Sequence, residues 1–143
     1  MIGIVVVSHS AALAEAVVDL VTGLVPGAGS GMQPRIAVAA GAAGALGTDA
    51  TAVAAAIEEV DAPHGVLVLY DLGSALLSTE LALELIDPDL ASRVQISCAP
   101  LVEGLFAAMI SAGATGIPDP LEAARSQAEQ AAAAKCAGAG FST

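Results

Sequence analysis

The sequence predicts an α/β domain, with a mostly parallel sheet of four to five strands and helices on both faces of the sheet. Apolar runs typical of buried strands alternate along the chain with segments of helical periodicity, and Gly- and Pro-rich stretches separate them. This alternation is typical of parallel strands joined by crossover helices. The chain has 143 residues, 56% of them hydrophobic, which suffices for one domain with its own core.

The first predicted strand is the continuous apolar run 2–7, as expected for a strand that is buried on both faces. Ser10 or Ser8 is expected to cap the helix that follows. This helix is predicted to bury one apolar face, formed by Leu13, Val17, Leu20, Val21 and Leu24. A Gly-rich loop over 26–34 leads into a weaker second strand at 35–40.

A flexible connection rich in Gly and Ala is predicted for residues 41–47. Thr48 or Asp49 then caps a helix that extends to about Val60. The clearest strand after the first one follows at 66–70.

Ser74 is predicted to be the N-cap of the next helix, which stops at Asp87 and Pro88 and has apolar positions at Leu76, Leu77, Leu81, Leu83 and Leu85. A fourth strand is expected at 93–98, then a helix at 101–112. A last helix begins at Pro120 and extends to about Lys135. We therefore expect one domain over 1–136 and a mobile tail over 137–143.

The charge of the chain excludes several kinds of partner. Four Lys and Arg against 15 Asp and Glu give a net charge of −11. Nucleic acids require clustered cations, and an anionic membrane surface repels an acidic protein. No strongly apolar stretch reaches the roughly 18 residues of a membrane-spanning helix. We expect a cytoplasmic protein that binds neither nucleic acid nor membrane and attracts basic protein partners.

Metal and nucleotide sites have no support in the sequence. Cys98 lies in an apolar run and is predicted to be in the core, whereas Cys136 lies near the C-terminal tail. Their spacing fits no metal or redox motif. No Walker A, dinucleotide-binding or nucleophile-elbow pattern occurs, and metal-ligating residues do not cluster. We expect no metal and no cofactor bound by this chain.

His9 is the best candidate for chemistry, because it directly follows the first predicted strand. In parallel sheets, sites form beyond the carboxyl ends of the strands, where the strand order reverses. Asp71 follows the third strand and would face His9 if these strands were neighbours, as in the flavodoxin-like order. A neutral imidazole nitrogen is a competent nucleophile near pH 7, and a carboxylate on the other nitrogen fixes the tautomer. The pair predicts a phosphoryl acceptor, with a separation within about 2.6–3.2 Å.

Four residues at helix starts are candidates to support a phosphoryl group through N–H groups and hydroxyls: Ser10, Thr48, Gly73 and Ser74. None of the four basic residues follows a strand. The alternative for His9 and Asp71 is that each merely caps a helix. His64 precedes the third strand and is predicted to be a turn residue, while Glu103 either lies near the rim or is an acid favoured by a helix dipole.

Four segments, in this order along the chain, resemble a known family: Ile4–Ser10, Gly47–Ala50, Tyr70–Ala75 and Ala99–Gly104. Together they resemble DhaM, the family of phosphoryl-donor subunits of phosphotransferase-system dihydroxyacetone kinases. The DhaM domain is similar to the IIA domain of mannose-type sugar phosphotransferases. The resemblance covers roughly residues 2–115.

The resemblance implies the mannose-type IIA fold and a phosphoryl relay. The phosphoryl group would pass from phosphoenolpyruvate through enzyme I and HPr to the distal nitrogen of His9, with Asp71 on the other nitrogen. It would then pass to ADP held by DhaL, while DhaK binds dihydroxyacetone. The resemblance also implies homodimers and the activity of a phosphoenolpyruvate–glycerone phosphotransferase subunit. Some members carry HPr and enzyme I domains in the same chain, so this shorter chain is expected to use separate carriers.

Two other functions remain open. The IIA component of a mannose-type sugar transporter has the same phosphohistidine and a different acceptor, although Asp71–Ala75 and Gly47–Asp49 fit DhaM better. A non-catalytic dimerisation or regulatory module would leave His9 unused.

Overall fold

The structure is a computed structural model, which describes residues 1–27 and 33–138. Within these residues, four strands form one all-parallel sheet: β1 (Gly3–Ser8), β2 (Arg35–Ala40), β3 (Val66–Tyr70) and β4 (Val94–Ser97). Their order is β2-β1-β3-β4, so the first and third strands are neighbours, which confirms the flavodoxin-like order. Val7 pairs with Tyr70 in the register. His9 and Asp71 therefore leave the sheet at the same edge.

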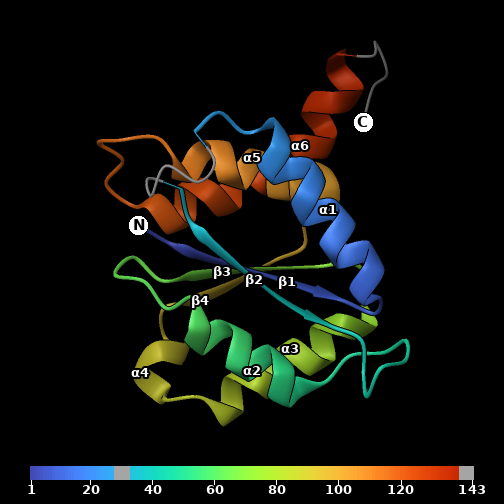
Figure 1. Cartoon of the computed structure of the whole chain (residues 1–143). Helices are drawn as coiled ribbons and strands as arrows, with labels where there is room; N and C mark the ends of the chain where they lie inside the picture. Colours follow the sequence, from blue (N-terminus) through green and yellow to red (C-terminus); the bar gives the residue numbers. More distant parts are fainter. Residues whose placement is uncertain (28–32, 139–143) are drawn as a thin grey trace.

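Helices of the described residues cover both faces of the sheet (Figure 1). One face carries α1 (Ala11–Leu24), α5 (Leu101–Ala112) and α6 (Pro120–Gly138). The other face carries α2 (Ala50–Glu59), α3 (Ser74–Leu85) and the short α4 (Pro88–Ala91). None of these helices is long and apolar enough to cross a membrane.

Strand β1 lies at the centre of the sheet and supplies side chains to both cores. Ile4 and Val6 pack in the core under α1, α5 and α6, whereas Val5 and Val7 pack in the core under α2 and α3. All four side chains are fully buried. Burial on both faces is the reason that the run is apolar at every position rather than at alternate positions.

The predicted buried face of α1 is wrong in part, and α3 buries small residues in place of its leucines. The leucines expected to bury one face of α1 are mostly exposed, and Ala14 takes the buried place beside Val17 and Val21; the exposed ones are Leu13, Leu20 and Leu24. On α3 the buried positions are Ala75, Thr79 and Ala82, while the leucines left exposed are Leu77, Leu81 and Leu85. Small side chains let these helix backbones approach the sheet closely, so the leucines end up on the flanks.

Other differences occur where elements begin and end. Cys98, predicted to be in the core, is exposed; it follows the last residue of β4 and lies between buried Ser97 and Ala99. Ser74 is the first residue of α3 and not its N-cap, which is Gly73. Asp87 caps the unpredicted helix α4. Helix α6 extends to Gly138, so that Cys136 is helical.

The predicted loop over 26–34 and the predicted tail fall partly outside the described residues, which exclude 28–32 and 139–143. Both cysteines are free. The predicted strands, the caps Ser10 and Asp49, and the bounds of α5 are confirmed.

Candidate active site

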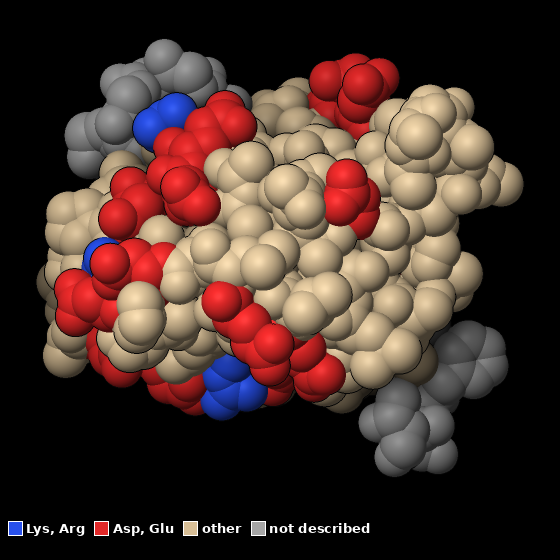
Figure 2. Space-filling model, turned by 90° about the horizontal axis from the view of Figure 1, so that it is seen from below, with Lys and Arg blue, Asp and Glu red and all other residues tan. Residues whose placement is uncertain are grey.

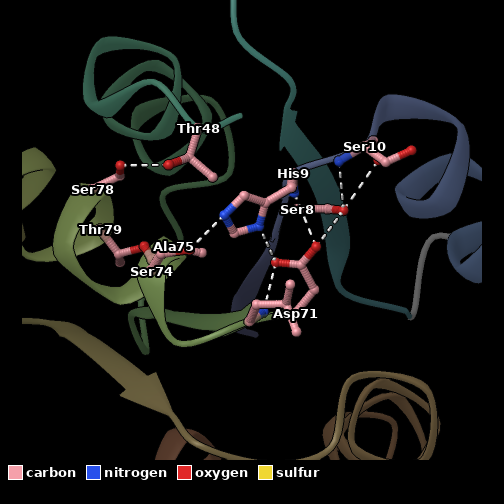
Figure 3. A network of polar contacts seen from close by, with 10 residues as sticks. Ser8, His9, Ser10, Thr48, Asp71, Ser74, Ala75, Ser78 and Thr79 are labelled. Atoms are coloured by element: carbon pink, nitrogen blue, oxygen red, sulfur yellow. Dashed lines mark hydrogen bonds and ion pairs between the residues drawn. The ribbon is translucent and has the colours of Figure 1, made fainter. Parts of the chain in front are cut away.

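The imidazole of His9 lies between two polar side chains beyond the carboxyl ends of β1 and β3 (Figure 3). Its Nδ1 is 2.9 Å from Oδ1 of Asp71, and its Nε2 is 2.6 Å from the hydroxyl oxygen of Ser74. A carboxylate only accepts, so Nδ1 carries the proton and donates it to Asp71. Nε2 then has the free lone pair, and the Ser74 hydroxyl donates to it. The geometry thus makes Nε2 the nucleophilic atom of the ring.

The carboxylate of Asp71 accepts four hydrogen bonds. Oδ1 accepts from the His9 ring and from the N–H of Leu72 (2.7 Å), and Oδ2 accepts from the His9 N–H and the Ser8 hydroxyl (both 2.9 Å). Burial raises the pKa of Asp71, but the hydrogen bonds from His9, Leu72 and Ser8 outweigh burial and hold the pKa below its usual value. Asp71 is therefore ionised near neutral pH and can accept the proton that Nδ1 donates.

The main chain around His9 is held by the segment that follows β2. The N–H of Gly47 donates to the His9 carbonyl (2.9 Å), and the N–H of Gly41 donates to the Ser8 carbonyl (3.1 Å). Between them, residues 41–47 close in a tight turn. Gly47 adopts a φ of 143°, a conformation that side chains disfavour. The backbone of His9 is thus tied to the segment after β2, while its side chain is tied to the end of β3.

Helix α3 begins next to Nε2. The N–H groups of Ala75 and Leu76 donate to the carbonyls of Leu72 and Gly73. Those of Gly73 and Ser74 have no partner among the described residues. Unpaired N–H groups and the helix dipole both favour an anion at such a position.

Of the four predicted supporting residues, Ser74 bonds to Nε2, and Gly73 directly precedes it as the N-cap of α3. Thr48 instead bonds to the hydroxyl of Ser78 (2.6 Å) and joins the start of α2 to α3. Ser10 caps α1 by accepting from the N–H of Leu13 (3.2 Å), and lies on the far side of Ser8 from the ring (Figure 3).

Two residues of this network are not among those predicted from the sequence. Ser8 is fully buried, and its hydroxyl supports Asp71. The sequence contains one signal for this role of Ser8: it is a polar residue at the end of a buried apolar strand, directly before the candidate nucleophile. Ser78 lies one helical turn after Ser74, a spacing that places both on one face of α3.

Within the described residues, none of the four basic residues forms a hydrogen bond or ion pair with a residue of the site. Arg35 is exposed at the start of β2. The other three form ion pairs: Arg93 with Asp61, Arg125 with Glu122 and Glu129, and Lys135 with Glu103. His64 lies in the turn before β3, at the opposite end of the sheet, as predicted. The described residues contain no group of three or more His, Cys, Asp or Glu that could hold a metal ion.

A family model described as PTS system fructose IIA component (EIIA-man) matches residues 3–121. The chain is 46% identical over 134 residues to a Klebsiella michiganensis protein named PEP-dependent dihydroxyacetone kinase, phosphoryl donor subunit DhaM. That match covers 90% of this chain and 27% of the relative, so the chain spans about a quarter of the length of such relatives.

A shorter relative matches over most of its own length. The Listeria innocua protein named PEP-dependent dihydroxyacetone kinase 2, phosphoryl donor subunit DhaM, is 38% identical over 111 residues, which cover 77% of this chain and 85% of the relative. The fold is also similar to the crystal structure of a protein of unknown function, EF1359. The TM-score is 0.73 at 30% identity, with 91% of this chain and 94% of that chain covered.

Proposed function

The chain belongs to the PTS system fructose IIA component (EIIA-man) family, and from this we propose that it is the phosphoryl-donor subunit of a phosphoenolpyruvate-dependent dihydroxyacetone kinase. In this proposal, Nε2 of His9 carries the phosphoryl group and Asp71 orients the ring. The observation that supports it most strongly is the pairing of Nδ1 with Asp71 at 2.9 Å, which leaves Nε2 free to attack.

Uptake is a displacement at phosphorus between two histidines. The Nε2 lone pair of His9 attacks the phosphorus of the phosphohistidine of HPr, and the Nε2–P bond forms as the N–P bond to the carrier breaks. The electron pair of that bond returns to the carrier's imidazole. Nδ1 of His9 keeps its proton, and the positive charge that develops on the ring is balanced by Asp71, whose low pKa keeps it ionised.

Donation reverses the same geometry toward a different acceptor. A terminal phosphate oxygen of ADP on DhaL attacks the phosphorus, and the N–P electron pair returns to Nε2. The described residues around His9 offer the phosphoryl group only hydroxyls, N–H groups and a helix dipole, with no salt bridge. Weak ground-state binding of this kind suits a group that must leave again.

The proposal includes further partners that support the relay. HPr and enzyme I supply the phosphoryl group, and DhaL with DhaK consumes it on dihydroxyacetone. We further propose that residues 1–136 form one domain that works as a homodimer in the cytoplasm. No cofactor is bound by this chain itself in the proposal, because ADP stays on DhaL.

A sugar-transport IIA component is the second candidate, and the description of the matching family favours it. It shares the uptake step and differs only in the acceptor. The names of the relatives, which are 34–48% identical, all refer to dihydroxyacetone kinases and favour the first candidate.

Radiolabelled phosphoenolpyruvate with enzyme I and HPr tests the proposal. We expect an acid-labile label on the wild-type protein and none on His9→Ala. Addition of DhaL with ADP, DhaK and dihydroxyacetone should discharge the label into triose phosphate. A wild-type protein that takes no label from competent HPr would contradict the uptake step, and a label that discharges only to a sugar-transport IIB partner would support the second candidate.

A further inference from the structure

Three side chains at the start of α3 are joined one after another, in the order Ser74, His9, Asp71 (Figure 3). The hydroxyl oxygen of Ser74 is 2.6 Å from Nε2 of the ring, and Nδ1 of the ring is 2.9 Å from Oδ1 of Asp71. Both separations lie in the range of about 2.6–3.2 Å in which a nucleophile, its base and the group that orients the base act together. The site therefore contains a serine placed for activation by histidine.

The protons of these three residues lie where acyl transfer requires them. Because the ionised carboxylate of Asp71 only accepts, Nδ1 donates to Asp71 and the Ser74 hydroxyl donates to Nε2. The hydroxyl proton thus points at the base that would remove it. Asp71 would balance the charge that the ring gains on taking this proton. Such a triad is recognised by its geometry and not by the order of its members along the chain.

Ser74 differs from the other serines of this network. Ser8 is fully buried and gives its proton to Asp71, and Ser78 pairs with the hydroxyl of Thr48. Among the described residues, Ser74 has the one hydroxyl that bonds to a histidine nitrogen. It is also exposed to solvent, so a small ester can reach its oxygen.

The main chain at the start of α3 can stabilise the negative oxygen of a tetrahedral intermediate. The N–H groups of Gly73 and Ser74 have no partner among the described residues. A Cβ at Gly73 would meet no atom within 4 Å beyond the adjacent residues, so the space beside this part of the main chain is open. In a serine triad, the N–H of the nucleophilic serine is itself one donor to the oxyanion. Both unpaired donors and the helix dipole therefore favour negative charge next to the Ser74 hydroxyl.

We propose that Ser74 is a nucleophile in its own right and that the chain hydrolyses small activated esters of carboxylic acids through an acyl group on Ser74. His9 acts first as base and then as acid, and Asp71 orients its ring. Residues 72–74 are all exposed, so an ester is not enclosed and its reactivity must come from a good leaving group. This activity goes beyond the phosphoryl transfer proposed above and does not depend on it.

Acylation and deacylation both use the same proton carrier. In acylation, Oγ of Ser74 bonds to the carbonyl carbon while its proton passes to Nε2, and the alcohol leaves with that proton as the ester C–O bond breaks. In deacylation, water bonds to the acyl carbon and gives a proton to Nε2, and Oγ leaves with that proton as its bond to the acyl carbon breaks. One ester and one water give one acid and one alcohol.

Acyl transfer and phosphoryl transfer use the same lone pair of His9. A phosphoryl group on Nε2 would take the lone pair that accepts the Ser74 proton, and would occupy the position to which the hydroxyl now donates. The two activities therefore exclude each other, and only the unphosphorylated protein is expected to hydrolyse esters.

The test follows release of 4-nitrophenol from 4-nitrophenyl acetate by wild type, Ser74→Ala and His9→Ala. Because a histidine alone also attacks this ester, Ser74→Ala, which keeps His9 and Asp71, measures the background of the ring. We expect the wild-type rate to exceed this background about 10-fold or more, less than fully developed general-base catalysis because the site is open to water. His9→Ala should lose the excess. Acid quenching and peptide mass spectrometry should find the acetyl group on Ser74 of the wild-type protein.

Ser92→Ala is the matched control, because it removes a serine hydroxyl that bonds to the Asp89 carbonyl at the end of α4. Its rate should stay within about twofold of wild type. A fluorophosphonate provides a second probe, since it reacts with activated serines by forming an O–P bond as fluoride leaves. It should label Ser74 in the wild-type protein and not in His9→Ala. Equal urea unfolding of wild type and Ser74→Ala confirms that the variant folds.

Three results would overturn the inference. Equal rates in wild type and Ser74→Ala, or an acetyl group on His9 in place of Ser74, would reject the serine nucleophile. Fluorophosphonate labelling that persists in His9→Ala would reject its activation by the ring. None of these measurements uses HPr or DhaL, so failure of the ester hydrolysis leaves the phosphoryl relay standing, and failure of the relay leaves the ester hydrolysis standing.

Discussion

Asp71 holds His9 at two points, with Oδ1 2.9 Å from the ring Nδ1 and Oδ2 2.9 Å from the backbone nitrogen. One carboxylate therefore fixes both the position of the main chain and the rotation of the ring. Four donors fill the carboxylate, so neither oxygen is free to turn toward solvent. These two contacts orient the ring so that Nε2 faces Ser74 at the start of α3.

Replacement of Asp71 by Asn should slow phosphoryl uptake about 10²-fold or more, on the scale of general acid–base and orienting residues. The amide keeps the shape of the side chain but no longer balances positive charge on the ring, and its NH₂ group can select the wrong tautomer. Rapid-quench labelling from phospho-HPr measures the rate. Asp87→Asn, at the cap of α4 far from the site, is the control. Wild-type kinetics in Asp71→Asn would reduce Asp71 to a structural role.

The stability of the protein in acid should depend on Asp71. Its pKa in the folded protein lies below the ordinary value of 3.8, so the unfolded chain binds the proton more readily. The ionised carboxylate therefore adds stability that is fully present above the unfolded pKa and lost as the pH falls through the folded pKa. Urea unfolding between about pH 6 and pH 2 should show a shallower acid decline for Asp71→Asn than for wild type. If stability declined equally with falling pH in wild type and Asp71→Asn, the ionisation of Asp71 would not contribute to stability.

Loss of the Ser74 hydroxyl should make the phosphorylated form less stable. The hydroxyl bonds to Nε2 in the unphosphorylated site, and it is the side chain best placed to donate to a phosphoryl oxygen once that nitrogen is occupied. A lost hydrogen bond of about 0.5–1.5 kcal/mol corresponds to a change of several-fold in the equilibrium between phospho-HPr and this protein. The equilibrium is measured by quenched labelling of Ser74→Ala. Ser92→Ala, which removes a hydroxyl bonded to the Asp89 carbonyl, should leave it unchanged.

Replacement by alanine should change the free energy of unfolding in opposite directions at two glycines. A Cβ at Gly3 would lie 1.9 Å from the carbonyl oxygen of Val60, so Gly3→Ala forces β1 and the end of α2 apart, at a cost of roughly 1–3 kcal/mol. Gly23 lies in α1, and a Cβ at this position would meet nothing within 4 Å, so Gly23→Ala should stabilise the protein by about 0.5–1 kcal/mol. Urea denaturation of both variants gives the two free energies of unfolding, and equal signs would contradict the packing of β1 on α2.

Much of the fold was predictable because strand and helix periods are written plainly in the chain. The predicted bounds agree closely with the structure for β1, which is an apolar run, and for α5, which follows a proline. The adjacency of His9 and Asp71 was expected only if the first and third strands were neighbours, because parallel neighbours end at the same edge, and the structure confirms that order.

The remaining differences arise from tertiary contacts that no local pattern contains. Periodicity gave Leu13 and Leu20 of α1 a core position, but Ala14 packs against the sheet instead. Ser74 was predicted to be an N-cap from its local sequence. Its hydroxyl instead bonds to the ring of His9, 65 positions away in the chain. Thr48 is another such case, because its bond to Ser78 depends on how α2 and α3 pack.

The 62 positions between His9 and Asp71 matter for a chain that is still being made. His9 leaves the ribosome with the first strand, yet its neighbour in the sheet is the third strand, which is synthesised after β2 and α2. Until β3 pairs with β1, no carboxylate selects between the two ring nitrogens, and both tautomers are populated. A nascent or truncated chain therefore contains the histidine without a preferred nitrogen. The ring acquires its nucleophilic nitrogen only when β3 docks and brings Asp71 to it.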